Sequence, residues 1–245
     1  MSTHLRLEEV DSTNTYAKQH FAELPDGSVV SARVQTAGRG RVGRKWHSGD
    51  GLDITASFLF KNLEQPFLAG AITGIAAIDL LKEECPEVSS FLKWPNDIYV
   101  RHFKLAGMLS EGVWEQGKIA CVICGIGMNV NSGNELLSGA GQPAVSLFSL
   151  TQKNFNVDFL IERLVKIVNR YYIICQQYPQ EVFAKWREYN RLSGHEIEVV
   201  DPMGKSMRGV FCDVSPDGAM IFEADGEKKL FSCGDVKINA QSLDF

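Results

Sequence analysis

Residues 35–46 read Gln35-Thr36-Ala37-Gly38-Arg39-Gly40-Arg41-Val42-Gly43-Arg44-Lys45-Trp46, and no other stretch of the chain combines such backbone freedom with such positive charge. Glycine lets a main chain approach a ligand closely. Arginine supplies permanently charged, fork-shaped donors that match phosphate and carboxylate oxygens. The closing tryptophan can cover an apolar or aromatic surface. We interpret the stretch as a loop that wraps a negatively charged ligand, with an ordinary basic surface loop as the alternative.

The glycine spacing also satisfies the pattern G-x-G-x-x-G of dinucleotide-binding proteins, which has meaning only between a strand and a helix. A valine-rich strand over Val29–Gln35 does precede Gly38. After Gly43, however, the sequence contains the turn signal Ser-Gly-Asp-Gly in place of a helix. The phosphate-binding P-loop is a near miss, since Arg44 and Lys45 stand where it requires Lys and Ser/Thr. Neither nucleotide motif therefore explains the loop.

Length and composition indicate a globular chain without membrane segments. The 245 residues, 44% of them hydrophobic, suit one large domain or one medium and one small domain. The longest apolar stretch, 67–81, is too short and too interrupted to span a bilayer. The N-terminus has no signal-peptide core, so we expect a cytoplasmic protein. A net charge of −5 argues against nucleic acid as a main partner, which leaves local ligand binding as the reason for the basic loop.

The six cysteines predict neither a disulfide scaffold nor a metal centre. Cys121 and Cys124 have the spacing of a redox or zinc pair but lie in an apolar run that we interpret as a buried strand. Residues three apart on a strand point to opposite faces, and no second pair completes a ligand set. We expect buried free thiols.

The apolar patterns predict an α+β chain. A helix should begin after Asp11 or Ser12, whose side chains suit a helix cap. The remaining elements of the first part are strands over Val29–Gln35 and Leu52–Phe60, helices over Phe67–Glu84, Val157–Gln177 and Gln180–Arg191, and, between them, a meander of mostly antiparallel strands over 91–125. This order lacks the regular strand–helix alternation of a doubly wound sheet.

The pattern changes at His195. Four or five short strands follow, broken by Asp-Pro-Met-Gly, Ser-Pro-Asp-Gly and Asp-Gly turns. We expect a catalytic or binding domain over residues 1–192 and a small barrel over 193–245.

Five stretches together resemble the biotin–protein ligase family, in the family's order and over roughly the first 150 residues. They are Asp11-Ser-Thr-Asn14, Gln35 with Gly38–Trp46, Lys93-Trp-Pro-Asn-Asp97, Lys104-Leu-Ala-Gly107 and Gly125-Ile-Gly-Met-Asn-Val-Asn131. The resemblance implies a mostly antiparallel mixed sheet with helices, similar to class II aminoacyl-tRNA synthetases, followed by a small C-terminal SH3-like β-barrel.

The resemblance also implies an ATP-dependent, AMP-forming reaction. Biotin and ATP, with Mg²⁺, give biotinyl-5′-AMP, and a lysine of a biotin carboxyl carrier protein or domain then takes the biotinyl group. The protein would be a monomer or a homodimer. Many bacterial members begin with a DNA-binding domain; here the first motif starts at Asp11, so we expect no repressor function.

Each matched residue has a role implied by the family. Lys104 would contact the biotin carboxylate and the α-phosphate at the reacting centre, assisted by the loop arginines Arg39 and Arg41. The biotin side would comprise Ser12, Thr13, Asn14, Gln35, Gly38, Gly40 and Gly107, with Arg39, Arg41 and Lys104. The ATP side would comprise Trp46, Lys93, Asn96, Asp97 and Asn129, with the same two arginines. The ligands of the metal ion are unknown.

For several of these residues a purely structural interpretation, without a role in ligand binding, stays open. Ser12 can serve only as a helix cap, Lys93 can be a solvated strand-end lysine, and Arg44 and Lys45 can belong to the outer face of the loop. Two other functions also compete: a lipoate–protein ligase, which shares the adenylate mechanism, and a non-catalytic nucleotide-binding module.

Overall fold

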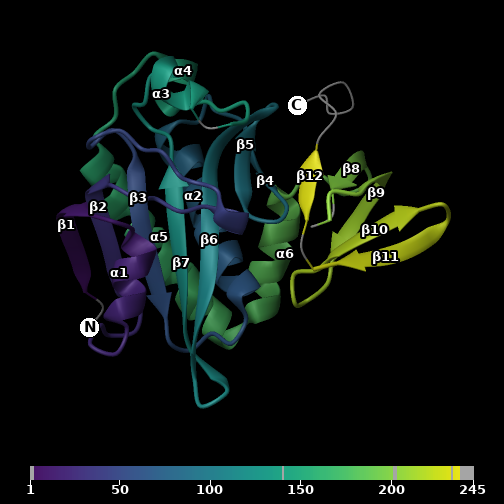
Figure 1. The fold of residues 1–245 in the computed structure, drawn as a ribbon, viewed down its shortest axis with the longest axis horizontal. Helices are drawn as coiled ribbons and strands as arrows, with labels where there is room; N and C mark the ends of the chain where they lie inside the picture. Colours follow the sequence, from purple (N-terminus) through teal and green to yellow (C-terminus); the bar gives the residue numbers. More distant parts are fainter. Residues whose placement is uncertain (1–2, 140, 201–202, 233, 238–245) are drawn as a thin grey trace.

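The computed structural model describes residues 3–139, 141–200, 203–232 and 234–237. Its main part is a seven-stranded mixed sheet in the order β1-β2-β3-β7-β6-β5-β4 (Figure 1). The strands are β1 (His4–Val10), β2 (Val29–Gln35), β3 (Ile54–Phe60), β4 (Ser90–Lys93), β5 (Asp97–Val100), β6 (Phe103–Glu115) and β7 (Lys118–Met128). Only β1 and β2 run parallel; all other neighbours are antiparallel.

Three helices cover one face of this sheet: α2 (Pro66–Glu84), α5 (Val157–Gln177) and α6 (Pro179–Tyr189) (Figure 1). Proline begins both α2 and α6, where its missing N–H costs nothing. The Asn156 side chain caps α5 by accepting a hydrogen bond from the backbone N–H of Phe159. The buried apolar residues of the three helices and of this sheet face form one continuous core.

A half-buried carboxylate connects the three helices. Tyr171 on α5 and Tyr189 on α6 both donate hydrogen bonds from their hydroxyls to Asp79 on α2, at 2.6 and 2.5 Å. Burial, together with these bonds, raises the pKa of both tyrosines. The helical layer is thus fixed by polar bonds as well as by apolar packing.

The opposite face of the sheet carries α1 (Thr13–Gln19) and a second, smaller apolar cluster. Cys121 belongs to that cluster and Cys124 to the main core, so the two thiols do point to opposite faces as predicted. Both are free and buried, and burial raises the pKa of the Cys121 thiol to about 11. The remaining short helices are η1 (Arg41–Gly43), α3 (Asn134–Ser138) and α4 (Leu147–Thr151).

The C-terminal part is a five-stranded antiparallel sheet in the order β11-β10-β9-β8-β12. Its strands are β8 (Glu196–Val200), β9 (Ser206–Val214), β10 (Met220–Ala224), β11 (Glu227–Phe231) and β12 (Asp235–Lys237). Within the described residues the edge strands β11 and β12 do not pair with each other, so the sheet is open there. The predicted β-rich C-terminal part is confirmed, and its closure into an SH3-like barrel stays a prediction.

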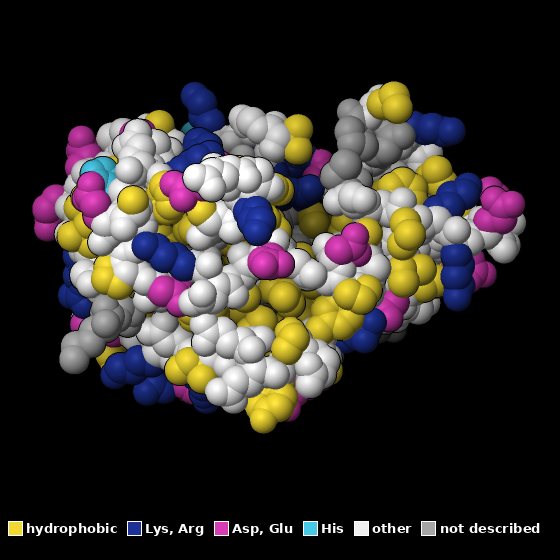
Figure 2. Space-filling model, turned by 90° about the horizontal axis from the view of Figure 1, so that it is seen from below, with side chains coloured by type: hydrophobic (Ala, Val, Ile, Leu, Met, Phe, Trp, Pro, Cys, Tyr) yellow, Lys and Arg dark blue, Asp and Glu magenta, His cyan; other side chains and the backbone are white. Residues whose placement is uncertain are grey.

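The C-terminal sheet projects beside the main body as a separate lobe (Figures 1 and 2). It is joined to the main sheet by the buried Trp94, whose indole N–H donates a hydrogen bond to the carbonyl of Gly218 at 2.9 Å. Gly218 has φ of 87° and lies against Phe67 of α2, where a side chain would not fit. On the face seen in Figure 2, basic and acidic side chains are interspersed. None of the helices in the described parts of the chain is both long enough and apolar enough to cross a membrane.

Candidate active site

A cavity of about 690 Å³ lies on the sheet face that carries α1, between the glycine–arginine loop (Gly38–Trp46) and the C-terminal sheet. Most of the residues predicted from the sequence line it: Ser12, Thr13, Asn14, Gln35, Arg39, Gly40, Arg41, Trp46, Lys93, Asn96, Asp97, Lys104 and Gly107. The five separate motifs therefore meet in one place. A cavity of this size suits a small organic ligand or cofactor.

One end of the cavity is polar and uncharged. Ser12 caps α1, and Ser12, Thr13 and Asn14 are all at most 4% exposed. The Gln35 side-chain oxygen accepts hydrogen bonds from the backbone N–H of Thr13, at 2.9 Å, and from its hydroxyl, at 3.2 Å. Since its oxygen is occupied, the Gln35 amide nitrogen is the group left to donate to a ligand.

Glycines form the floor of the cavity. A side chain at Gly125 would collide with the amide of Asn14, and a side chain at Gly127 would collide with the indole ring of Trp46. These two strand residues therefore let α1 and the loop lie directly against the backbone of β7. The glycine-bearing motif of β7 is explained by this close approach.

The loop is folded back on itself. Gly38 and Trp46 are joined by a backbone hydrogen bond of 2.9 Å, and the N–H of Gly40 donates to the carbonyl of Arg44 at 2.7 Å. The turn passes through the left-handed region at Val42 and Gly43, with φ of 52° and 72°. The result is a short hairpin that holds Trp46 over the floor and projects its arginines sideways.

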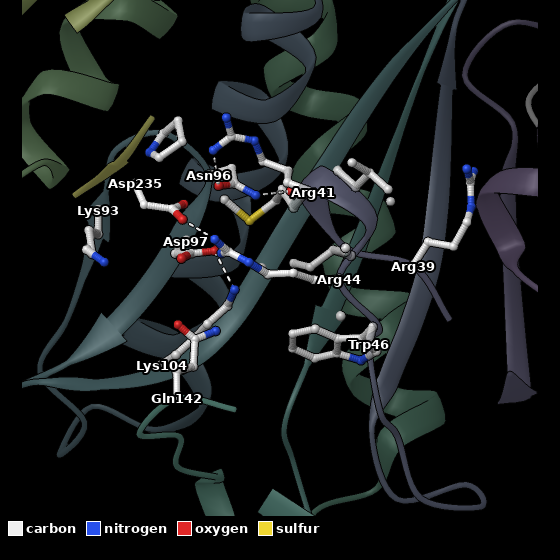
Figure 3. Close-up of a pocket in the computed structure, with 18 of the residues that line it drawn as sticks. Arg39, Arg41, Arg44, Trp46, Lys93, Asn96, Asp97, Lys104, Gln142 and Asp235 are labelled. Atoms are coloured by element: carbon white, nitrogen blue, oxygen red, sulfur yellow. Dashed lines mark hydrogen bonds and ion pairs between the residues drawn. The ribbon is translucent and has the colours of Figure 1, made fainter. Parts of the chain in front are cut away.

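The other end of the cavity is cationic. Arg41, Arg44 and Lys104 converge there, whereas the side chain of Arg39 lies apart from them (Figure 3). Arg41 donates a hydrogen bond to the side-chain oxygen of Asn96 at 3.3 Å, and Arg44 forms an ion pair with Asp235. Positive charge is therefore concentrated where the strand β5 begins.

Lys104 is held by an ion pair of 2.7 Å with Asp97, and both side chains are 14% exposed. Its ammonium lies 5.8 Å from the centre of the Trp46 ring. The backbone of Lys104 also pairs with the 143–145 segment through its N–H to Pro143 and its carbonyl to Val145. An anionic ligand that enters this end would compete with Asp97 for the ammonium of Lys104.

Lys93 lies deeper than a solvated strand-end lysine. Its ammonium donates a hydrogen bond to the hydroxyl of Tyr99 at 3.2 Å, and burial lowers the pKa of Lys93. The Tyr99 hydroxyl donates in turn to Gln142 at 3.4 Å. A half-buried ammonium that forms no ion pair with a carboxylate of the described residues is a good position for an anionic ligand group.

Two predicted residues do not line the cavity. Gly38 lies behind it, where a Cβ would stand 2.5 Å from the carbonyl oxygen of Trp46, so its glycine identity serves the hairpin. Asn129 is 5% exposed and donates a hydrogen bond from its side chain to the carbonyl of Val145 at 3.0 Å. Both residues support segments of the cavity wall without lining the cavity themselves.

Other lining residues were not predicted. Arg44, for which an outer-face position was an open alternative, lines the cavity, as do Tyr99, His102, Gln142 and Asp235. Asp235 comes from β12, so the C-terminal sheet forms part of the wall. A group of three or more His, Cys, Asp or Glu that could hold a metal ion is absent from the described residues.

Comparison with known proteins places the chain in a family. The model of the biotin/lipoate A/B protein ligase family matches residues 7–129, which include the polar end, the loop and Lys104. The chain belongs to the biotin/lipoate A/B protein ligase family.

Curated relatives of this ligase family match nearly the whole chain. A biotin–(acetyl-CoA-carboxylase) ligase of Paracoccus denitrificans is 31% identical over 94% of this chain and 98% of its own length. The bifunctional ligase/repressor BirA of Bacillus spizizenii is 34% identical over 95% of this chain and 73% of its own length.

Among solved structures, the biotin protein ligase from Aquifex aeolicus in complex with biotin and ATP is similar, with a TM-score of 0.81 and 25% identity. The similarity covers 97% of this chain and 98% of that chain, so it includes the C-terminal sheet. The α+β architecture predicted from the sequence is thereby confirmed.

Proposed function

We propose that the protein is a biotin–protein ligase that activates biotin with ATP to biotinyl-5′-AMP and transfers biotin to a lysine of a biotin carboxyl carrier domain. The observation that carries this proposal is the polarity of the cavity. An uncharged polar end, made of the buried Ser12–Asn14 and the half-buried Gln35, is joined across Trp46 to a cationic end at Arg41, Arg44 and Lys104. Biotin has the matching form, with a neutral ureido head at one end and a carboxylate at the other.

The chemistry follows from the cationic end. A carboxylate oxygen of biotin attacks the α-phosphorus of ATP, the bond from that phosphorus to the bridging oxygen breaks, and pyrophosphate leaves. The attack joins two anions, so fixed positive charge lowers the barrier where negative charge accumulates. We assign to Lys104 the contact with the oxygens that pass from carboxylate to mixed anhydride, and to Arg41 and Arg44 the contact with the phosphates. No protein nucleophile is needed.

The second step uses the same cavity. The uncharged amine of an acceptor lysine attacks the acyl carbon of biotinyl-5′-AMP, an amide forms, and AMP leaves with the bonding electron pair. Trp46 and the loop would keep water away from the anhydride until the acceptor arrives. Mg²⁺ enters as part of the nucleotide substrate, because such ions are usually held by substrate phosphates and one or two carboxylates, and the carboxylate of Asp97 lines the cationic end.

The remaining roles follow the same division. On the biotin side we place Ser12, Thr13, Asn14, Gln35 and Gly107; on the ATP side we place Trp46, Lys93, Asn96 and Asp97. We further propose that residues 1–192 form the catalytic domain, that residues 193–245 form a second domain that completes the ATP side, and that the enzyme works in the cytoplasm.

The family name also includes lipoate ligases, and the polar end argues against lipoate. The dithiolane ring of lipoate has neither an amide N–H nor a carbonyl, so it would leave the side-chain amide nitrogen of Gln35, whose oxygen is already bonded to Thr13, without a ligand partner. A buried polar group left unpaired costs about 1–3 kcal/mol. The expected discrimination therefore favours biotin.

The test is isotope exchange between ATP and pyrophosphate, with biotin, with lipoate and with neither. The proposal expects exchange with biotin alone, followed by a gain in mass of one biotinyl group on an added carboxyl carrier domain when ATP is present. Exchange with lipoate only would assign the second ligase activity of the family. Nucleotide binding without either exchange would indicate a non-catalytic module.

A further inference from the structure

Glu111 lies on β6, outside the cavity, and receives two hydrogen bonds at a single carboxylate oxygen. Asn14, at the polar end, donates from its side-chain amide at 2.9 Å, and Arg39, in the loop, donates from its guanidinium at 2.6 Å. In the sequence Glu111 is 97 residues from Asn14 and 72 residues from Arg39. Glu111 is therefore the point at which the floor of the polar end and the first turn of the loop are joined.

The carboxylate also fixes the orientation of Asn14. Because a carboxylate can only accept, the amide nitrogen of Asn14 must face Glu111 and its oxygen must face the other way. That oxygen accepts a hydrogen bond from the hydroxyl of Ser57 at 2.6 Å, and Ser57 also lies 2.7 Å from the hydroxyl of Thr13. Ser57 is fully buried. Glu111, which does not line the cavity, therefore determines which groups of the polar end donate and which accept hydrogen bonds.

Arg39 is occupied by this contact. Its guanidinium forms an ion pair with Glu111, and in Figure 3 it lies apart from Arg41, Arg44 and Lys104. The charge of Arg39 is neutralised by its partner. Its geometry suits an anchor for the loop better than a phosphate ligand, which differs from the role that the sequence pattern implied.

We propose that Glu111 is a positioning residue of the ligase, which couples the biotin end to loop closure by holding Asn14 in one orientation and Arg39 in one place. This inference rests on the proposed function. Ordering a glycine-containing loop costs conformational entropy, so a hairpin containing Gly38, Gly40 and Gly43 needs fixed contacts at its ends. Glu111 supplies one at the start of the loop.

The test uses Glu111→Gln, which keeps the size of the side chain but removes the charge and allows the amide to present a donor to Asn14. We expect KM for biotin in pyrophosphate exchange to rise by roughly ten- to a hundredfold, the effect of losing a charge-assisted hydrogen bond. We expect kcat at saturating biotin to stay within about threefold, because the groups at the reacting centre are unchanged.

A second readout needs no biotin. Trypsin cleavage after residues 41, 44 and 45 of the ligand-free protein should accelerate several-fold in Glu111→Gln, because the loop has lost its anchor. The matched control is Asp50→Asn, which breaks an ion pair of 2.7 Å between the exposed side chains of Arg33 and Asp50. The control should change neither the KM for biotin nor the cleavage rate, and thermal melts should show that both variants are folded.

Arg39→Gln, alone and combined with Glu111→Gln, shows whether the two residues act together. If they do, the double variant is about as impaired as the worse single variant. The proposal is overturned if Glu111→Gln behaves as the wild type, or if Arg39→Gln lowers kcat without changing the KM for biotin. A wild-type protein without biotin-dependent exchange would instead overturn the proposed function, while the cleavage experiment would still decide whether Glu111 anchors the loop.

Discussion

Arg44 of the glycine–arginine loop forms an ion pair with Asp235 of β12, and both residues line the same cavity. The loop is therefore in contact with the C-terminal sheet at one of its ends and with Glu111 of the main sheet at the other. The side chains of Arg44 and Asp235 are about half exposed, at 53% and 45%. The pair consequently matters more for the position of the loop than for the stability of the fold.

Substitutions at Arg44 and Asp235 should distinguish the effect of the charge of Arg44 on ATP binding from the effect of the ion pair that holds the loop. Arg44→Ala should raise KM for ATP by about tenfold, the effect of losing one interaction of about 1.4 kcal/mol with the phosphates. Asp235→Asn should leave KM for ATP unchanged or lower it, because Arg44 keeps its charge and loses a competing partner. Steady-state pyrophosphate exchange measures both. Equal increases for the two variants would show that the ion pair itself, and not the charge of Arg44, supports ATP binding.

Lys104→Ala should slow adenylate formation by roughly ten- to a few hundredfold, since a charged hydrogen bond is worth about 1.5–3 kcal/mol and each 1.4 kcal/mol is tenfold in rate. Biotin binding without ATP should weaken less than the rate falls, because much of the negative charge develops only during the attack. Pyrophosphate exchange and calorimetric titration with biotin check the two effects, beside a thermal melt. A folded variant that exchanges at the wild-type rate would remove Lys104 from the reacting centre.

The strong local patterns could be read from the sequence because neighbouring residues determine them. The strand Val29–Gln35 and the helix Val157–Gln177 are confirmed at both ends, and Ser12 is the helix cap. The edge strand β1 was not predicted, since its alternating charged residues resemble a surface segment until β2 pairs with it. The helices α3 and α4, with five residues each, are too short for periodicity to reveal.

The candidate site likewise contains residues that could be predicted from the sequence and residues that could not. Residues inside family motifs, such as Gln35 and Lys104, could be placed at the cavity before the structure was known. Glu111, Gln142 and Asp235 could not, because each reaches the cavity or its supporting contacts only through chain folding over a long separation. For Asn129, the motif identified a residue that the structure uses to hold the neighbouring segment at Val145.

Gly127→Ala should impair the site while a neighbouring glycine tolerates the same change. The added methyl group would overlap the indole ring of Trp46, so the ring must move away from the floor. Overpacking of this kind costs about 1–3 kcal/mol, and KM for ATP should rise by at least about tenfold. Gly133→Ala is the control, because a Cβ there meets no atom within 4 Å. Equal kinetics for both variants would mean that Trp46 does not need its position on β7.

Lys93→Met should alter the pH dependence of stability. Burial holds the pKa of Lys93 below its ordinary value of 10.5 in the folded protein, so the unfolded chain binds this proton more tightly. The free energy of unfolding should therefore rise with pH between the folded pKa and about 10.5, and Lys93 adds no slope below that window. Thermal melts from pH 7 to 10.5 should show a smaller rise for Lys93→Met than for Lys118→Met, which replaces an exposed lysine at the start of β7. A rise of equal size in both variants would contradict a lowered pKa at Lys93.

The glycine–arginine loop should be more exposed to protease before the intermediate forms than after. Val42 at its tip is 86% exposed, and the loop offers four basic residues to trypsin. With biotin and ATP together, cleavage within 39–45 should slow by at least about tenfold, because contacts with the adenylate offset the entropy of ordering the glycines. Mass spectrometry of timed digests identifies the cut sites. Equal cleavage with and without both substrates would exclude closure of the loop on the ligand.

The wall of the cavity contains residues from Ser12 to Val236, almost the full span of the described chain. Such a site has a high contact order, and its parts are distant from one another during synthesis. A nascent chain can complete the α1 end and the loop long before β12 has left the ribosome, but the partner of Arg44 is then missing. The reaction chamber is therefore complete only after β12 has been synthesised and Asp235 has reached the loop.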